Sequence, residues 1–211
     1  MTAAQQRAFE QFGERYLLQP PAAGRLDPVA LFGSGAPLTV EVGFGNGDNL
    51  LSRAGAEPDR SFLGIEVHRP GVGRLMGRAA AAGIEHLRVA CHDAVEVLRD
   101  WLEPGCVDEL QVLFPDPWHK KRHNKRRLVS PAFLDIAHAA LKPGGQLLLA
   151  TDWADYADQM RELLSADDRY TNLSPSGDTV PRPESRPITR FEARGHRLGH
   201  EVFDFAFRRE A

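Results

Sequence analysis

The sequence has few cysteines and no obvious pattern of metal ligands. Cys91 and Cys106 are its only cysteines, and they lie fifteen positions apart, so a zinc ribbon and a disulfide framework are both excluded. We expect both thiols to be reduced and to lie in the core. The eight histidines form no HExxH or comparable pattern, so we expect no metal cofactor.

Long apolar runs are also missing. No stretch of about eighteen apolar residues occurs, and residues 1–18 are amphipathic and interrupted by charges, unlike a signal peptide. We therefore expect a soluble cytoplasmic protein that makes no membrane contact. The net charge of −3 argues against a protein that coats nucleic acid generally, so any such contact must come from clustered residues.

The length of the chain limits its domain organisation. With 211 residues, it is long enough for one α/β domain with a full core and too short for two of ordinary size. We expect an N-terminal helix and arm over residues 1–37, followed by the main domain over residues 38–211. Residues 19–24, QPPAAG, end the helix predicted over residues 1–18 and form a linker outside the sheet. The arm is either a mobile tail or a flap that orders on a ligand.

Short apolar runs alternate with helix-length segments from Leu38 onward, which predicts βα repeats and a mainly parallel sheet. The strands of this part are predicted at Leu38–Val42, Phe62–Glu66, Leu87–Cys91, Val107–Phe114 and Gln146–Thr151. The helices are predicted near Asp48–Ala56, Val72–Ala82, Ala94–Trp101, Pro131–Leu141 and Asp155–Ser165. The last two strand candidates, Tyr170–Leu173 and Val202–Phe207, have no crossover helix between them, so we expect an antiparallel hairpin at one edge of a seven-stranded sheet.

A glycine-rich turn, EVGFGNG, spans the end of the first predicted strand and the residues after it. Gly43, Gly45 and Gly47 let the backbone turn tightly and approach a ligand closely. The turn differs from the dinucleotide fingerprint GxGxxG, because the third glycine comes one position early and Asp48 follows it. A negative charge at the start of the next helix disfavours a pyrophosphate and favours a ligand that carries positive charge.

Acidic residues stand at the ends of successive strands. Glu41 ends the first, and Glu66, about twenty residues past the glycine turn, is placed to accept hydrogen bonds from ribose hydroxyls. Asp93 follows the third strand, where it can bind an adenine amino group, and Asp116 follows the fourth. Glu66 or Asp93 alone is equally compatible with a helix cap or a surface carboxylate. Together the four favour an adenosyl ligand with a cationic sulfonium and ammonium, S-adenosyl-L-methionine (SAM).

A basic segment directly follows the fourth strand end. No acidic residue occurs between Asp116 and Asp135, and six cations fall within eight positions: Lys120, Lys121, Arg122, Lys125, Arg126 and Arg127. A charge run is usually a solvated face, but its position beside the acidic strand ends predicts a surface for RNA phosphates. Trp118 and Phe44 are the candidates for stacking on an extracted base, and Trp118 is also compatible with packing against its two neighbouring prolines.

Six motifs in the same order and spacing resemble the bacterial tRNA (guanine-N7)-methyltransferase family, of the TrmB type. They are VEVGFGNGDNLL, FLGIEVHRPGVG, CHDAVEVL, LFPDPWHKKRHNKRRLV, ATDWADYADQM and VPRPESRPITRFEARGHRLGH. The resemblance covers residues 38–207 and implies a Rossmann-like class I SAM-dependent fold. It implies methyl transfer from SAM to the variable-loop guanine at position 46 of tRNA, with S-adenosyl-L-homocysteine as product. We expect no obligate protein partner, and a monomer or a homodimer.

The resemblance also implies roles for individual residues. The cofactor-binding positions are Glu41, Gly43, Gly45, Gly47, Glu66, Asp93 and Asp116, and Asp116 is also the catalytic position. The substrate-binding positions are Lys120, Asp152, Thr189, Arg190, Phe191 and Glu192. The RNA-contacting positions are Arg122, His123, Asn124, Lys125, Arg126 and Arg127. The family often has Lys where Arg190 stands and a second Phe where Leu113 stands, and the N-terminal arm matches it poorly.

The chemistry of guanine N7 restricts how the base is held. N7 has a lone pair and no proton, so attack on the methyl carbon needs alignment at about 3–3.5 Å rather than a general base. An arginine bound to O6 and N7 would occupy that lone pair. We therefore expect Asp116, with Glu192 or Asp152, to bind the Watson–Crick edge. The expected phosphate contacts are the basic segment together with Arg182, Arg186, Arg190, Arg194 and Arg197.

Three other functions compete with this prediction. A SAM enzyme for small molecules would share the acidic strand ends but would not need the basic segment. A dinucleotide-dependent oxidoreductase is disfavoured by the spacing of the glycine turn and by Asp48. The third is an RNA-binding module that keeps the fold without catalysis, and turnover by an Asp116 variant distinguishes it.

Overall fold

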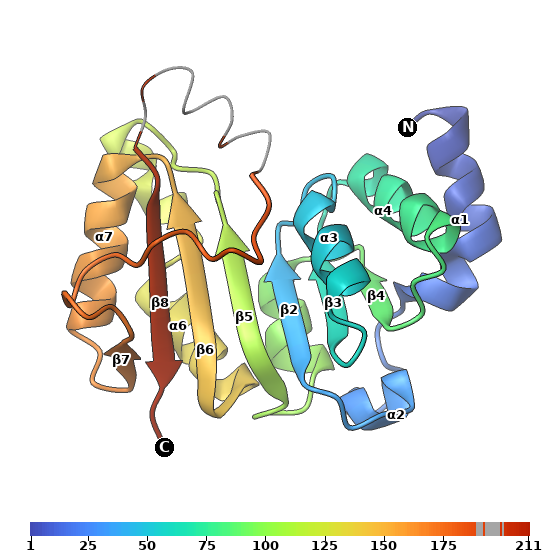
Figure 1. Cartoon of the computed structure of the whole chain (residues 1–211), viewed down its shortest axis with the longest axis horizontal. Helices are drawn as coiled ribbons and strands as arrows, with labels where there is room; N and C mark the ends of the chain where they lie inside the picture. The colour runs from blue at the N-terminus through green and yellow to red at the C-terminus, as the bar shows by residue number, and fades with distance from the viewer. Residues whose placement is uncertain (189–191, 193–198, 200) are drawn as a thin grey trace.

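The computed structural model describes residues 1–188, 192, 199 and 201–211 (Figure 1). Its strands are β1 (Leu17–Leu18), β2 (Leu38–Val42), β3 (Ser61–Ile65), β4 (Leu87–Ala90), β5 (Val107–Leu113), β6 (Leu141–Thr151), β7 (Tyr170–Asn172) and β8 (Phe203–Arg209). Its α-helices are α1 (Ala3–Tyr16), α2 (Pro28–Phe32), α3 (Asp48–Ala56), α4 (Arg69–Ala81), α5 (Ala94–Glu96), α6 (Pro131–Ala140) and α7 (Ala154–Ser165). A π-helix, η1 (Val97–Trp101), continues α5, and a 3-10 helix, η2 (Lys121–Arg126), precedes α6.

In the described part of the chain these strands form one sheet in the order β1-β4-β3-β2-β5-β6-β8-β7. The pairs from β1 to β6 are parallel, whereas β8 is antiparallel to both β6 and β7. The predicted Rossmann-like α/β fold with an antiparallel edge hairpin is therefore confirmed. All seven predicted strands are present.

The predicted strand count is wrong by one, because β1 adds an eighth strand. Leu17 and Leu18, which we predicted as the end of the first helix, pair in parallel with Val89 and Ala90 of β4. Without β1, the backbone of β4 would form an open edge of the sheet. The linker at residues 19–24 lies outside the strands, as predicted. The division of the chain at residue 37 stays a prediction.

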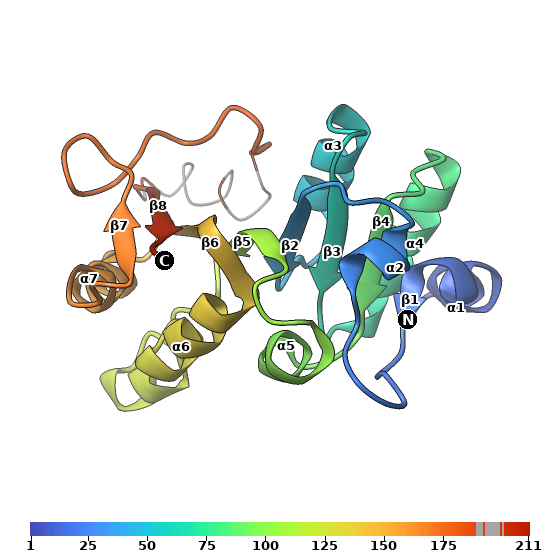
Figure 2. The ribbon, with the colours of Figure 1, turned by 90° about the horizontal axis from the view of Figure 1, so that it is seen from below.

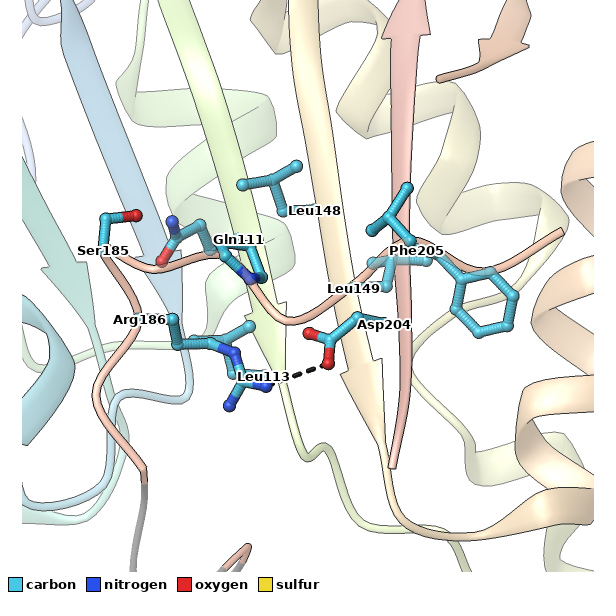
Figure 3. Close-up of a pocket in the computed structure, with 10 residues that line it drawn as sticks. Gln111, Leu113, Leu148, Leu149, Ser185, Arg186, Asp204 and Phe205 are labelled. Atoms are coloured by element: carbon cyan, nitrogen blue, oxygen red, sulfur yellow. Dashed lines mark hydrogen bonds and ion pairs between the residues drawn. The ribbon is translucent and has the colours of Figure 1, made fainter. Parts of the chain in front are cut away.

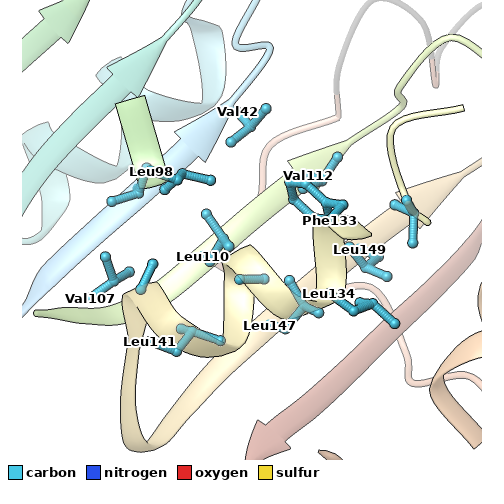
Figure 4. Close-up of a cluster of buried hydrophobic side chains, with 14 of the residues drawn as sticks. Val42, Leu98, Val107, Leu110, Val112, Phe133, Leu134, Leu141, Leu147 and Leu149 are labelled. Carbon is cyan, nitrogen blue, oxygen red and sulfur yellow. The ribbon is translucent and has the colours of Figure 1, made fainter. Parts of the chain in front are cut away.

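Helices cover both faces of the sheet (Figure 2). On one face α5, η1, α6 and α7 enclose the larger apolar core, which Figure 4 shows between β5, β6 and α6. On the other face α3 and α4 cover β2, β3 and β4, and α1 packs against α4 (Figure 1). No helix within the described ranges is long and apolar enough to cross a bilayer.

The N-terminal helix is packed closely on the domain. Glycines of α4 let α1 approach, since a methyl group on Gly73 would lie 2.8 Å from the carbonyl oxygen of Gln5. The buried hydroxyl of Tyr16 donates to the carbonyl oxygen of Ile84 at 2.8 Å. Helix α4 is also in contact with the glycine turn, because a methyl group on Gly71 would lie 2.0 Å from the Gly45 carbonyl oxygen.

Two glycines of α4 provide a matched pair of substitutions. We expect Gly77→Ala to raise the free energy of unfolding by about 0.5–1 kcal/mol, because alanine is the better helix former and its methyl group would make an ordinary 3.8 Å contact. We expect Gly71→Ala to lower it by about 1–3 kcal/mol through overpacking against Gly45. Urea unfolding of both variants measures this difference, and equal effects would contradict the close contact of α4 with the turn.

Candidate functional site

The parallel register places the predicted acidic strand ends along one edge of the sheet. In this register Val42 lies opposite Ile65 and Val112, Ile65 opposite Ala90, and Leu113 opposite Ala150. The residues that follow these strands therefore lie side by side, in the spatial order Asp93, Glu66, glycine turn, Asp116 and Asp152. Ligands of open α/β sheets bind at this carboxyl edge.

The glycine turn has two kinds of glycine. Gly43, Gly45 and Gly47 all have positive φ angles, of 70°, 58° and 73°. A methyl group on Gly47 would lie 2.7 Å from Leu75 of α4, so this glycine permits packing. Methyl groups on Gly43 and Gly45 would meet no atom within 4 Å, so these two glycines border open space. This is the part of the turn where a ligand can approach the backbone.

Glu66 lies directly beside this turn. Its carboxylate accepts hydrogen bonds from the backbone N–H groups of Gly45 at 2.9 Å and His68 at 2.8 Å. The side chain is half-buried, and it joins the end of β3 to the glycine turn. The bonds fix the orientation of the carboxylate, and its remaining lone pairs can accept from ligand hydroxyl groups.

Glu41 lies beneath the turn rather than at the open edge. It is 3% exposed, and Asn49 of α3 donates to it at 2.8 Å. The same Asn49 amide donates to Gln111 of β5 at 2.8 Å, and Gln111 donates to Glu109 at 2.6 Å. Burial raises the pKa of Glu41 to about 7, against the opposing effects of Asn49 and Arg53. The protonation of a buried carboxyl such as Glu41 therefore responds to any cation that binds near it.

Asp93 is an exposed helix cap. One of its oxygens, Oδ1, accepts from the backbone N–H groups of Val95 at 2.9 Å and Glu96 at 3.2 Å, at the start of α5. The capping role that we left open is therefore observed. The cap holds the carboxylate at the start of α5 through Oδ1, and it does not exclude a ligand contact by Oδ2.

The turn that carries Asp116 is bounded by two unusual residues. Phe114 and Trp118 have positive φ angles of 53° and 49°, which non-glycine residues rarely adopt. Asp116 is exposed, and its Oδ1 accepts from the Trp118 N–H at 3.0 Å. The Phe114 N–H donates to Ala150 of β6 at 2.8 Å. Strained backbone of this kind persists where the surrounding structure holds it, and it is common at active sites.

The basic segment divides into a surface part and a buried anchor. Lys120, Lys121, Arg122, Lys125 and Arg126 are exposed, and the guanidinium of Arg126 lies over the Trp118 ring at 4.9 Å. Arg127 is only 4% exposed, and its RNA contact stays a prediction. It donates to the Pro117 carbonyl at 2.8 Å and pairs with Asp155 of α7 at 2.5 Å. Arg127 thus attaches the Asp116 turn to α7.

Apart from exposed Lys120 of the basic segment, the predicted substrate-binding residues fall into three groups. Thr189, Arg190 and Phe191, together with the predicted phosphate contacts Arg194 and Arg197, lie outside the described residues. Asp152 lines a pocket of about 450 Å³ with Trp153 and Phe203.

Glu192 differs from both groups because its side chain is almost fully buried. It is only 1% exposed, and its carboxylate pairs with Arg186 at 2.7 Å. Arg186 is itself only 3% exposed, and its contact with phosphate stays a prediction. A direct contact of Glu192 with the base is not supported by this arrangement.

Reasoning from the sequence missed the buried polar residues that support the site. Asn49 and Gln111 connect α3 with β2 and β5, and Arg53 pairs with both Glu57 and Glu109. Their signal in the sequence is polar residues at alternate positions of strands that are otherwise apolar, TVEV and DELQV. Parallel strands covered on both faces normally lack such residues, so the alternation indicates a polar layer beneath α3.

The raised pKa of Glu41 predicts a specific pH dependence. Burial raises the pKa of folded Glu41 to about 7, whereas the unfolded carboxyl has the ordinary glutamate pKa of 4.5. Its stabilising contribution is thus fully present below the unfolded pKa and is lost as the pH rises through the folded pKa. Relative to wild type, Glu41→Gln should gain up to about 3 kcal/mol in unfolding free energy between pH 4.5 and 8. Urea unfolding at several pH values tests this, with exposed Glu14→Gln as the control, and parallel pH profiles of Glu41→Gln and wild type would contradict it.

Comparisons with known proteins agree with this arrangement. A family model described as "Putative methyltransferase" matches residues 35–205. A tRNA (guanine-N(7)-)-methyltransferase of Cronobacter sakazakii is 50% identical, over 99% of this chain and 87% of the relative. A protein of the same name from Klebsiella pneumoniae is 54% identical, over 87% of this chain and 77% of the relative.

Solved structures show the same fold at low identity. The 16S rRNA methyltransferase KamB has a TM-score of 0.64 at 18% identity, over 93% of this chain and 100% of its own. A 16S rRNA adenine-N1 methyltransferase from Catenulisporales acidiphilia, solved with its cosubstrate SAM, has a TM-score of 0.58 at 19% identity, over 89% of this chain and 93% of its own. These similarities support the fold alone, whereas the identities of 50% and 54% to curated relatives establish the family. The chain belongs to the tRNA (guanine-N7-)-methyltransferase family.

Proposed function

We propose that this protein transfers a methyl group from SAM to N7 of the variable-loop guanine at position 46 of tRNA, and releases S-adenosyl-L-homocysteine. The observation that carries the proposal is the composition of the carboxyl edge. Open space beside Gly43 and Gly45 lies between the carboxylates of Glu66 and Asp116, and the exposed part of the basic segment is adjacent. The proposed place of action is the cytoplasm, and the proposed assembly is a monomer or a homodimer.

The residues around the glycine turn fit SAM. Glu66, held by two backbone N–H groups, would accept from the ribose hydroxyls, and Asp93 would accept from the adenine amino group. Buried Glu41 would favour the cationic end of the ligand electrostatically. Asp48, at the start of α3, pairs with Arg78 at 2.5 Å, and Gly47 caps this helix without a side-chain hydrogen bond. When bound, SAM supplies an electrophilic methyl group on a positively charged sulfur.

Asp116 is the proposed catalytic residue. Its exposed carboxylate would accept from guanine N1–H and the 2-amino group and would thereby orient N7 without occupying its lone pair. An opposite charge about 4 Å away is worth about 1 kcal/mol in water and about 4 at an effective dielectric constant near 20. Because Asp116 is exposed, its effect on the positive charge of the methylated ring depends on how far bound RNA excludes water.

The exposed cations of the basic segment are the proposed phosphate contacts. Arg122 and Lys125 lie on η2, which follows the Asp116 turn and is attached to α7 through buried Arg127. A helical turn anchored in this way presents its charges at a fixed distance from the reacting base. We propose that Lys120 and η2 orient tRNA, while the glycine turn and Glu66 bind SAM.

The catalytic proposal predicts a specific loss of methyl transfer. We expect the wild type to transfer labelled methyl from SAM to an unmodified tRNA transcript, at a variable-loop guanine that cleavage selective for 7-methylguanine locates. Asp116→Asn should lower kcat by at least about a hundredfold, the usual size for a lost catalytic electrostatic contact, while tRNA binding persists.

Asp100→Asn, which neutralises an exposed carboxylate of η1, is the control and should keep wild-type kcat. Binding of tRNA without any label in wild type would favour a binding module over an enzyme. Label on a small molecule, independent of salt, would favour a different SAM enzyme.

The proposed phosphate contacts predict a separation of RNA binding from SAM binding. Lys125→Glu and Arg122→Glu should each weaken tRNA binding and reduce the slope of log affinity against log salt by about one, because one phosphate contact is lost. Affinity for S-adenosylhomocysteine, measured by calorimetry, should stay within about twofold. Arg99→Glu reverses an exposed charge on η1 and should leave both affinities unchanged. Equal loss of both affinities in the η2 variants would contradict the division of roles.

A further inference from the structure

A buried ion-pair cluster lies behind the Asp116 turn. The Arg186 guanidinium donates to Glu192 at 2.7 and 3.3 Å and to Asp204 of β8 at 2.9 Å, and these three residues are the Arg186 cluster. All three side chains are buried, with exposed fractions of 3%, 1% and 6%. Figure 3 shows the guanidinium directed at Asp204 across the strands of the sheet. The mechanism proposed above uses none of the three directly.

The cluster attaches a long segment to the sheet. Residues 173–188, the C-terminal loop, follow β7 and cross the face of β8, β6 and β5 that α3 and α4 leave uncovered (Figures 1 and 3). The N–H of Val180 donates to the Asp204 carbonyl at 2.8 Å, and Arg161 of α7 pairs with Asp178 at 2.7 Å near the other end of the loop. Arg186 is the buried anchor of the loop at the carboxyl edge.

Arg186 also contacts the turn that carries the catalytic residue. Its guanidinium carbon lies 5.4 Å from the centre of the Phe114 ring. Phe114 is one of the two non-glycine residues with positive φ, and Asp116 follows it by two positions. Asp204 lies opposite Ala150 of β6, and the Phe114 N–H donates to the same Ala150. One guanidinium of the C-terminal loop therefore contacts both β8 and the Asp116 turn.

The charges of the cluster make Arg186 difficult to replace. Two buried carboxylates bind one buried guanidinium, and among the described residues Arg182 also lies 3.9 Å from Glu192, with 40% of its side chain exposed. Burial raises the pKa of Asp204, and the charge of Arg186 opposes that effect. Removing Arg186 would break its ion pairs with both buried carboxylates, and breaking a buried ion pair by removing one partner is destabilising. Lysine keeps the charge but cannot match the planar fork that contacts both carboxylates.

We propose that Arg186 is a positioning residue for methyl transfer, which holds Phe114 in its left-handed conformation and thereby fixes Asp116 relative to the C-terminal loop. The proposal rests on the proposed function for its catalytic consequence and on the contacts above for its structural one. In this proposal Glu192 acts indirectly, because its carboxylate binds the guanidinium of Arg186 and helps to hold the loop in place.

The test compares Arg186→Met, Arg186→Lys and Arg161→Met in the full chain. Arg161→Met is the matched control, because it removes an ion pair between the same loop and α7, at a partly exposed site away from the Asp116 turn. We expect Arg186→Met to lower kcat at least thirtyfold, with KM for tRNA and affinity for S-adenosylhomocysteine within about threefold of wild type. Arg186→Lys should recover part of kcat, and Arg161→Met should keep it.

A second measurement is independent of activity. Hydrogen exchange at the amides of Phe114 and Trp118 should become faster in Arg186→Met and stay unchanged in Arg161→Met. A folded Arg186→Met with wild-type kcat and wild-type exchange would overturn the proposal, as would equal effects of Arg161→Met. If Arg186→Met does not fold, Arg186→Lys decides the question by the same two measurements. If wild type transfers no methyl to tRNA, the proposed function fails, and the exchange result alone decides the role of Arg186.

Discussion

The parallel pairing of β2 with both β3 and β5 is the constraint on which the site depends. Because all three strands run in the same direction and in register, their ends and the side chains that follow lie on one edge. Glu66 and Asp116, fifty positions apart in sequence, are thereby brought to either side of the glycine turn. An antiparallel arrangement would place the ends of neighbouring strands at opposite edges of the sheet.

A buried polar layer supports this edge from below. Asn49 bridges Glu41 and Gln111, so the helix that starts at the glycine turn is bonded to both central strands. Each member pays a desolvation cost that its hydrogen bonds offset only while the geometry holds. The layer therefore makes the position of α3 specific, and it contains one ionisable carboxyl, Glu41, whose pKa burial raises to about 7.

Arginines that are close in the sequence lie in two different environments, and their sequence positions do not predict which of them is buried. Arg126 lies exposed over Trp118, while its neighbour Arg127 is buried against Tyr156 and paired with Asp155. Arg182 is partly exposed, while Arg186 is buried between two carboxylates. In both pairs the buried arginine fixes a loop, whereas the other arginine is more exposed: Arg126 lies over Trp118, and Arg182 donates to the Arg186 carbonyl. The guanidinium suits both environments because its planar fork forms several hydrogen bonds at once and its charge persists on burial.

The sequence by itself determined the alternation of strands and helices, the glycine turn and the acidic strand ends, because periodicity, turn chemistry and spacing are local properties. Its prediction of β2 and α3 agrees with the structure to the residue. Only the tertiary structure decided that Leu17–Leu18 complete the sheet, that Arg127 and Arg186 are buried, and that Asn49 joins two strands. Burial and pairing depend on partners such as Asp155 or Asp204, which lie tens of positions away or on another strand. The sequence alone does not show whether an arginine is exposed to water or paired with a buried carboxylate. The tertiary structure decides which environment the side chain has.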